Sequence, residues 1–186
     1  MSQDDQALLQ RIARRDKQAL ASFYQAHEKR LFSFILTKMN DAFEAVDVLN
    51  EVFMEVWNKA DSFQGRSKVS TWLFSIAYYK VVDRLRKIRP QQLDDEMMAE
   101  MTDDSPGIVS CLIGNEQAAQ VRHCIGTLST PHRAVMELTF FQEMSYSEIA
   151  TIVDCPENTV KTRMFHAKKA MKQCLNRLMG ATRDDD

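Results

Sequence analysis

Glycine and proline are scarce in this chain of 186 residues, which contains five glycines and four prolines. The glycines lie at apparent breaks rather than inside periodic segments, and no stretch of useful length alternates apolar and polar residues as a strand does. The apolar fraction of 45% is ample for packed cores, which argues against wholesale disorder. The sequence therefore predicts an all-α protein with few joints.

Further absences narrow the function. No apolar run is long enough to cross a membrane, and the start of the chain, MSQDDQALLQ, lacks the apolar run of a signal peptide. We therefore expect a cytoplasmic protein without membrane insertion. No phosphate-cradling glycine loop, nucleophile motif or metal-ligand cluster is present, so the sequence predicts no enzyme activity, no cofactor and no metal site.

Paired cysteine motifs are also lacking. The four cysteines, Cys111, Cys124, Cys155 and Cys174, are scattered and form no CxxC pair. In a reducing compartment, isolated cysteines are more often small buried residues than disulfide partners. We expect the former here, and a redox role stays open.

The net charge of −2 hides strong segregation along the chain. Residues 91–110 hold six acidic residues and no Lys or Arg. Residues 65–90 and 155–183 each hold seven basic residues and one acidic residue. Two basic faces suit one polyanion contacted at two places. The acidic segment is either a solubilising linker or a screen for these basic faces.

The segment 145–169, SYSEIATIVDCPENTVKTRMFHAKK, carries the clearest pattern. Ser145 and Glu148 fit a capping box, and Asp154-Cys155-Pro156 breaks the helix before a second one. Apolar residues then follow at three- and four-residue steps: Val160, Met164, Ala167, Met171, Leu175 and Leu178. The pattern predicts a helix-turn-helix whose second helix enters the DNA major groove, or else an ordinary helical hairpin with a solvated basic face.

In the first half, the apolar pattern predicts two helices within residues 5–40. It predicts a third, very regular helix over residues 43–60. The expected core face of the third helix is Val46, Leu49, Val52, Phe53, Val56, Trp57 and Ala60. Its opposite face is acidic and carries one methionine: Asp47, Asn50, Glu51, Met54, Glu55 and Asn58. This face is either solvated or a docking surface for a basic partner helix.

A polar loop over residues 61–71 precedes the next predicted helix, which Trp72 opens with Ser70 or Thr71 as its cap. Its expected buried face is Leu73, Ile76, Ala77, Val81, Leu85 and Ile88. Lys80, Arg84 and Lys87 line an exposed face near Tyr78 and Tyr79. Aromatic rings beside cations suit single-stranded nucleic acid, because charge follows the phosphates while rings stack on bases. After it, residues 112–126 and the helix-start signal Leu128-Ser129-Thr130-Pro131 lead to the helix-turn-helix.

Taken together, these motifs resemble a bacterial RNA polymerase sigma factor of the extracytoplasmic-function (ECF) group. DVLNEVFMEVW (47–57) resembles the segment that docks on polymerase, and FQGRSKVSTWLFSIA with YYKVVDRLRK (63–87) resembles the segment that melts and reads the −10 element. LSTPHRAVMEL and SYSEIATIVDCPENTVKTRMFHAKKAM resemble the −35-binding domain. The resemblance covers roughly residues 15–89 and 115–178.

The resemblance implies domains over 1–90 (sigma region 2) and 112–180 (sigma region 4), an acidic linker over 91–111 and a tail over 181–186. It implies polymerase contacts through Asp47, Asn50, Glu51, Met54 and Glu55. It implies −10 contacts and melting through Phe63, Gly65, Lys68, Ser70, Thr71, Tyr79, Lys80, Asp83, Arg84, Arg86 and Lys87. It implies −35 contacts through Asn158, Thr159, Lys161, Thr162, Arg163, Phe165, His166 and Lys169.

The expected partners are core RNA polymerase, promoter DNA and an inhibitory anti-sigma factor. The chain departs from the family where Tyr79 replaces a usual Asn, His166 replaces a usual Arg, and Glu143 and Asn158 replace common glycines. These departures bear on the promoter sequence rather than on the class. The alternative function is a helix-turn-helix regulator that does not bind core polymerase as a sigma subunit.

Overall fold

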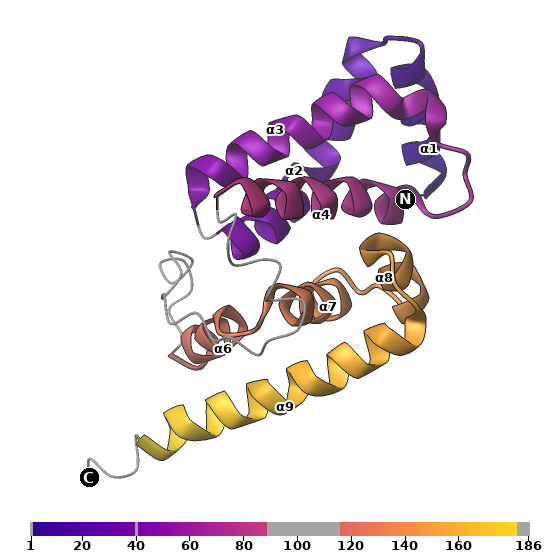
Figure 1. The fold of residues 1–186 in the computed structure, drawn as a ribbon. Coiled ribbons are helices and arrows are strands. Elements are labelled where there is room, and N and C mark those ends of the chain that lie inside the picture. Colours follow the sequence, from indigo (N-terminus) through magenta and orange to yellow (C-terminus); the bar gives the residue numbers. More distant parts are fainter. Residues whose placement is uncertain (1, 40, 89–115, 182–186) are drawn as a thin grey trace.

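The computed structural model describes residues 2–39, 41–88 and 116–181, and within these ranges every regular element is a helix (Figure 1). The N-terminal half, residues 2–88, consists of α1 (Ser2–Ala13), α2 (Lys17–Met39), α3 (Ala42–Lys59), the short 3₁₀ helix η1 (Ala60–Ser62) and α4 (Val69–Ile88). The C-terminal half, residues 116–181, consists of α6 (Glu116–Gly126), α7 (Thr130–Phe140), α8 (Tyr146–Val153) and α9 (Glu157–Ala181). The predicted all-α fold is confirmed for these residues.

Capping residues mark the ends of several helices. The carboxylate of Asp41 caps α3 by accepting hydrogen bonds from the backbone N–H groups of Phe43 (2.8 Å) and Glu44 (3.1 Å). At α8 the predicted capping box is present, since Ser145 and Glu148 each accept from the other's backbone N–H. Asp154 ends α8 in a left-handed conformation with φ 48°, which turns the chain into α9.

The start of α4 differs from the prediction. The helix begins at Val69 rather than at Trp72, so Ser70 and Thr71 lie inside its first turn and do not cap it. Thr71 is 1% exposed, and its hydroxyl has no hydrogen-bond partner among the described residues. The prediction failed because Val69, which is 2% exposed, anchors an earlier turn against the core.

The core contains most of the predicted apolar faces but not all of their members. Val46 was expected inside and is 45% exposed, because the buried stripe of α3 runs through Ala45, Val48 and Leu49 instead. Phe74 was not among the expected core residues, yet it is 1% exposed and its ring lies 5.1 Å from that of Phe34. Phe74 is buried because α4 packs against α2 and α3 and also against α8, which covers more than one of its faces.

The expectation of isolated, reduced cysteines is wrong for one pair. Cys124 of α6 and Cys174 of α9 form a disulfide bond. The two residues are 50 positions apart, so their pairing depends on how α6 packs on α9 and could not follow from sequence spacing. Cys155 is a free, partly buried thiol, and Cys111 lies outside the described residues.

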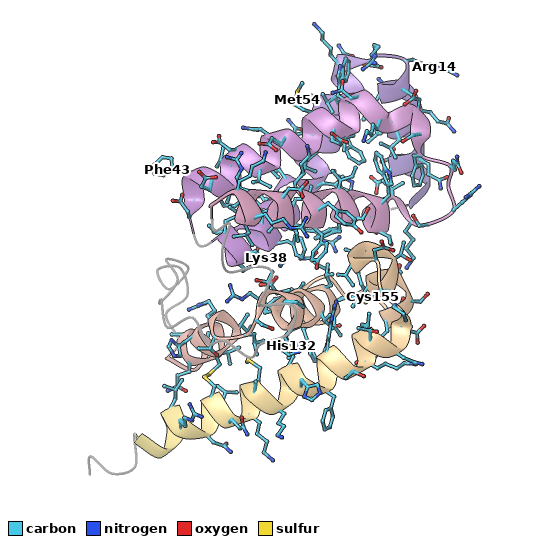
Figure 2. The ribbon with its side chains drawn as sticks, in the orientation of Figure 1. Arg14, Lys38, Phe43, Met54, His132 and Cys155 are labelled. Carbon is cyan, nitrogen blue, oxygen red and sulfur yellow. A yellow bond between two sulfur atoms is a disulfide. The ribbon has the colours of Figure 1, made fainter. Side chains whose placement is uncertain are left out.

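The two halves are packed against each other. Figure 1 shows the N-terminal helices as one layer, with α7 and α8 beneath α4 and the long α9 on the far side. The contacts are made chiefly by α4 with α8 and by α2 with α7. Lys38, labelled in Figure 2, lies on the side of the N-terminal half that faces the C-terminal half.

Some predictions fall on residues that the structure does not describe. The expected linker over 91–111, both domain boundaries beside it and the tail beyond residue 181 are among them. The helix expected over 112–126 is seen from Glu116 onward. Among the described residues, no helix is both long and apolar enough to cross a membrane. The same residues contain no group of His, Cys, Asp and Glu side chains suited to a metal ion.

Candidate protein and nucleic-acid interfaces

The outer face of α3 is hollowed along its length. An open hollow of about 460 Å³ is lined by Asp47, Asn50, Glu51, Met54, Glu55, Asn58, Lys80 and Arg84. All five residues predicted to dock on polymerase therefore share one surface, together with two of the predicted −10 residues on α4. Met54 is 58% exposed, and Figure 2 shows it on the side of the N-terminal half away from the C-terminal half.

Cations of α4 and acids of α3 neutralise each other across this hollow. Arg84 pairs with Glu51 at 2.6 Å and with Glu44 at 3.2 Å. Lys80 lies 3.6 Å from Glu55 and 3.9 Å from Glu51. The hydrogen bond from Lys59 lowers the pKa of the Glu55 carboxyl, although partial burial opposes this and the charge of Lys80 assists it.

These ion pairs divide the predicted polymerase-binding and −10-binding residues into two groups, those that pair within the protein and those that stay exposed. Among the described residues, Asp47 and Asn50 are exposed and make no side-chain ion pair or hydrogen bond. On α4, Asp83, Arg86 and Lys87 are likewise exposed. Among the acids predicted to dock on polymerase, Asp47 is therefore exposed and makes no ion pair with the described residues, whereas Glu51 and Glu55 pair with cations of α4.

Sequence reasoning missed Glu44 as part of this surface. Glu44 precedes Glu51 by seven residues, two turns earlier on the same face of α3. Extending the acidic stripe by the helical period therefore predicts it. Phe43, which is 87% exposed at the start of α3, was also missed, because the sequence analysis assigned it to neither face of the helix.

The loop before α4 holds its predicted site residues in different environments. The ring of Phe63 packs 5.4 Å from that of Trp72, and both rings are partly buried against the core. Gly65 adopts φ +69°, a conformation that favours glycine, although the space around its Cα is open. Ser70 is partly buried and Thr71 fully buried, so the surface of this loop comes chiefly from residues before Val69.

Lys68 and Tyr79 connect this region to the helix-turn-helix. The Lys68 ammonium lies 2.9 Å from the carboxylate of Glu148 in α8, although the side chain of Lys68 remains 69% exposed. Tyr79 is 45% exposed. Partial burial raises the pKa of the Tyr79 phenol, and the charge of Asp154 at the end of α8 raises it further.

The predicted −35 residues lie on the first half of α9. Six of them are exposed: Asn158, Lys161, Thr162, Phe165, His166 and Lys169. Thr159 and Arg163 are partly buried, and the guanidinium of Arg163 lies 3.7 Å from the Cys155 sulfur. Lys161 pairs with Glu157 one turn earlier at 2.8 Å, which keeps its ammonium on the outer side of the helix.

An aromatic group stands out on this face. Phe165 is 67% exposed, and its ring lies 5.5 Å from that of His166. The ring of His166 stacks at 6.1 Å on His132 of α7, a residue labelled in Figure 2. An exposed aromatic ring beside lysines provides apolar contact and charge together, which suits the methyl groups and phosphates of a major groove.

Both halves of the chain match known protein families. Residues 23–90 match the family described as Sigma-70 region 2, and residues 118–171 match the family described as Sigma-70, region 4. The chain is 27% identical over 179 residues to the ECF RNA polymerase sigma factor SigK of Mycobacterium tuberculosis, covering 95% of this chain and 96% of that protein. It is 28% identical over 186 residues to the RNA polymerase sigma-H factor of Pseudomonas aeruginosa, with the same coverage of both chains.

Solved structures share the fold. CnrH, in complex with the cytosolic domain of CnrY, superposes with a TM-score of 0.69 at 22% identity, covering 94% of this chain and 98% of that chain. The sigma factor RpoE of Bartonella quintana, in complex with the anti-sigma factor NepR, gives a TM-score of 0.65 at 23% identity, covering 83% of this chain and 97% of that chain.

Proposed function

We propose a residue-level division of labour for this chain, which belongs to the ECF-type sigma factors of RNA polymerase and carries sigma-70 regions 2 and 4. As a member of this group it directs RNA polymerase to promoters, and it does so as a non-catalytic subunit. Its partners by family are core RNA polymerase and promoter DNA. Which side chains perform each task is the proposal that follows.

We assign polymerase docking to the outer face of α3. Asp47 and Asn50 are the exposed polar groups, and Met54 supplies exposed apolar area between acids. Such a surface fits a basic amphipathic partner helix, since the methionine adapts its shape while the acids fix orientation. Glu51 and Glu55 serve a double role, because they also hold Lys80 and Arg84 of α4 in place.

We assign contact with the −10 region to α4 and the loop before it. Arg86, Lys87 and Lys68 offer exposed charge for phosphates, and Tyr79 offers an exposed ring for an unpaired base. Lys80 and Arg84 orient α4 against α3 and reach DNA only by sharing their charge with Glu51. Thr71 supports the loop from inside rather than touching a base, since its side chain is buried.

We assign contact with the −35 element to α9. Lys161, Phe165 and Lys169 lie on its exposed face, and the capping box at Ser145 fixes the turn that aims this helix. The single observation that carries the proposal is this exposed, basic and aromatic face on the second helix of a capped helix-turn-helix, held in the same chain as an exposed acidic docking face.

Reconstituted run-off transcription tests the proposal as a whole. Core polymerase, the full-length chain and genomic fragments are combined, and transcript starts are mapped. We expect discrete starts, each preceded by two elements shared among the active fragments. If the chain binds such fragments but gives no transcript with core polymerase, it is a helix-turn-helix regulator that does not act as a sigma subunit.

Charge reversal tests the docking face. Asp47→Lys is compared with Asp61→Lys, which makes the same change at an exposed residue of η1 in the same half. We expect Asp47→Lys to lose co-purification with core polymerase by about ten-fold or more, because a like charge would face the basic partner. Asp61→Lys should behave as the parent chain does, and equal retention of both variants would refute the assignment.

Alanine substitution tests the −35 face. Lys161→Ala is compared with Lys172→Ala, an exposed lysine farther along α9. Loss of a phosphate contact reduces the salt slope of promoter binding by about one, so only Lys161→Ala should flatten the slope and reduce transcription. The assignment fails if promoters with an intact and a scrambled −35 element respond equally to Lys161→Ala.

We also propose that an anti-sigma factor regulates this protein and that it acts in the cytoplasm, where its polymerase partner lies. Support comes from CnrH and RpoE of Bartonella quintana, whose structures were solved as complexes, the latter with an anti-sigma factor. Co-purification of the chain from its native host, followed by identification of bound proteins, tests this. Recovery of core polymerase alone under inducing and non-inducing conditions would argue against such a partner.

A further inference from the structure

Two aromatic side chains of α7 lie against the exposed face of α9, the helix that we assign to the −35 element. The ring of His132 stacks on that of His166, with 6.1 Å between ring centroids and 26° between ring planes. The ammonium of Lys168 lies 5.8 Å from the ring centroid of Phe140. Figure 2 shows His132 between α7 and α9, and the two helices pack directly on each other. The face that α9 offers to DNA is therefore shaped in part by α7.

Rings hold His166 on two sides. His132 stacks on its imidazole, and Phe165 meets it edge-on at 5.5 Å with 80° between the planes. Stacked and edge-to-face arrangements at these separations are favourable for aromatic rings. His132 is partly buried whereas His166 is exposed, so His132 is the more restricted member of the stacked pair. The orientation of the His166 ring is thus set before DNA arrives.

Neighbouring side chains on α9 itself are engaged elsewhere. Residues three and four positions apart are the usual contacts of a side chain along a helix. The hydroxyl of Thr162, four residues before His166, donates to a backbone carbonyl oxygen one turn earlier at 3.0 Å. The guanidinium of Arg163 lies 3.7 Å from a cysteine sulfur in the turn before α9. These neighbours on α9 therefore leave the orientation of His166 to the rings described above.

The histidine pair is not what joins the two helices. Val135 and Leu138 of α7 and Ala167 of α9 are each 0% exposed, and Met164 of α9 is 2% exposed. All four belong to the apolar core, and their burial holds α7 on α9. His132 is only partly buried beside them. Loss of the His132 ring should therefore leave the fold intact.

A histidine reads DNA differently from an arginine. A neutral imidazole has one N–H donor and one nitrogen acceptor, whereas a guanidinium presents a fork of donors that can bond to guanine bidentately. A hydrogen bond weakens steeply when its angle at the hydrogen falls below about 120°. Because His166 has a single bond of each kind to make, it discriminates between base edges only if its ring keeps one orientation.

We propose that His132 is a positioning residue for recognition of the −35 element: it holds the ring of His166 in the orientation that reads one base pair. The surface that determines −35 specificity then extends from α9 to α7. This inference rests on the proposed function, because that function places His166 at the −35 element. The target is a base edge in the major groove rather than a phosphate, so loss of His132 changes base preference and not merely affinity.

A base-resolved binding profile tests the proposal. The full-length chain is titrated with −35 duplexes from a promoter found by run-off transcription, with each base pair replaced in turn. His166→Ala identifies the position at which its side chain discriminates. His132→Ala should reduce discrimination at that same position by about five-fold or more, the lower end of the usual cost of one mismatched pair, and leave other positions unchanged. The double variant should match His166→Ala, because His132 acts through that residue.

Further substitutions separate ring stacking from a structural role. His132→Phe keeps a ring that stacks on His166 and should retain the parent profile. His132→Leu supplies apolar area without a ring and should behave as His132→Ala does. His123→Ala, at an exposed histidine of α6, is the matched control and should bind as the parent chain does. The urea midpoints of all these variants should stay close to that of the parent, since the core between α7 and α9 is unchanged.

A measurement without DNA checks the contact itself. A stacked neighbour displaces the NMR resonances of the His166 ring protons through its ring current. His132→Ala and His132→Leu should move these resonances toward their ordinary positions, and His132→Phe should keep them displaced. Resonances that are the same in the parent chain and in His132→Ala would overturn the proposal.

The binding profile can also refute it in two ways. An unchanged profile in His132→Ala would do so, and so would a loss of affinity spread evenly over all positions, which is what a purely structural role gives. If Lys161→Ala and His166→Ala both bind every duplex as the parent does, α9 does not read the −35 element and the proposed function fails with the inference. A profile altered by those two variants but not by His132→Ala refutes the role of His132 alone.

Discussion

At the residue scale, positive φ angles identify non-glycine residues whose backbone conformation is unfavourable. Arg15, Glu143 and Asp154 are the described non-glycine residues with positive φ, at 66°, 54° and 48° respectively. Asp154 belongs to a type that tolerates this region, and it ends α8. Glu143 is not of that type, and it is one of the positions where the family resemblance implies a glycine instead. The backbone at Glu143 is therefore strained.

Glu143→Gly should therefore stabilise the protein. A left-handed residue with a Cβ costs about 1–2 kcal/mol, of which the greater freedom of glycine in the unfolded chain cancels about 0.5–1 kcal/mol. We expect the free energy of unfolding to rise by about 0.5–1 kcal/mol, measured by urea denaturation. Gln25→Gly, at an exposed position inside α2, should instead lower it by about 1 kcal/mol. A destabilised Glu143→Gly variant would contradict the strain argument.

Glu148 gives the protein a defined acid sensitivity. Burial of this carboxyl alone would raise its pKa, but hydrogen bonds from Lys68 and Ser145 outweigh burial and lower the pKa below its ordinary value of 4.5. Since the folded state binds protons less readily than the unfolded state, this residue contributes stability above pH 4.5 that is lost as the pH falls through the lowered value.

The measurement is the urea midpoint of the parent chain and of Glu148→Gln between about pH 6 and about pH 3. The parent should be the more stable at pH 6, and the difference should shrink on acidification. Glu28→Gln, on α2, serves as a control whose difference from the parent should not follow this course. Parallel curves for the parent and Glu148→Gln would show that the hydrogen bonds do not favour the charged form.

At the element scale, the disulfide between Cys124 and Cys174 joins α6 to the C-terminal third of α9. The helix that presents the proposed −35 residues is thereby anchored beyond its DNA-facing part. A cross-link that spans 50 residues restricts the unfolded chain by up to about 4 kcal/mol on the loop-entropy estimate. The C-terminal half should therefore be less stable when this bond is broken.

Removal of the bond tests this. Cys124→Ala with Cys174→Ala should lower the unfolding midpoint, and dithiothreitol should lower that of the parent chain similarly while leaving the double variant unchanged. Cys155→Ala, at the free thiol, is the control and should respond to dithiothreitol as the parent does. The chain has four cysteines, and the number of free thiols counted after unfolding should rise by two on reduction. No rise in free thiols, together with a midpoint that dithiothreitol leaves unchanged, would show that the bond does not form in solution.

At the scale of the whole molecule, segregated charge makes the small net value of −2 misleading. One hypothesis for the six acidic residues within 91–110 is that they screen the basic surfaces of both halves while no DNA is bound. The alternative is that this segment is only a solubilising linker, and removal of its charge distinguishes the two.

Replacing Asp94, Asp95 and Glu96 by Asn, Asn and Gln discriminates between these alternatives. If the segment screens the basic faces, the affinity of the full chain for non-specific duplex DNA should rise at about 50 mM salt, and the gain should fade at about 200 mM as screening takes over. An equal affinity at low salt would leave the segment as a linker alone. Fluorescence anisotropy with a random duplex measures both values.

The sequence by itself determined the helical class, the capping box of α8 and the family of the protein, although the expected start of α4 was wrong. Asp41, Ser145 and Glu148 act on groups within three residues, and an apolar stripe depends on spacing of three or four, so these features follow from local chemistry. The ordered motifs likewise carried the family resemblance, which the comparisons confirmed.

Only the tertiary structure decided which predicted site residues are exposed and which are buried or paired within the protein. The engagement of Lys80 and Arg84 by acids of α3, the burial of Thr71 and the pairing of Cys124 with Cys174 all depend on residues brought together by packing. So does the pair of Lys38 and Glu137, 99 positions apart, which places the halves against each other. The spacing of residues along a helix determines the face on which a side chain lies. The residue that this side chain contacts depends on which other helix packs against that face.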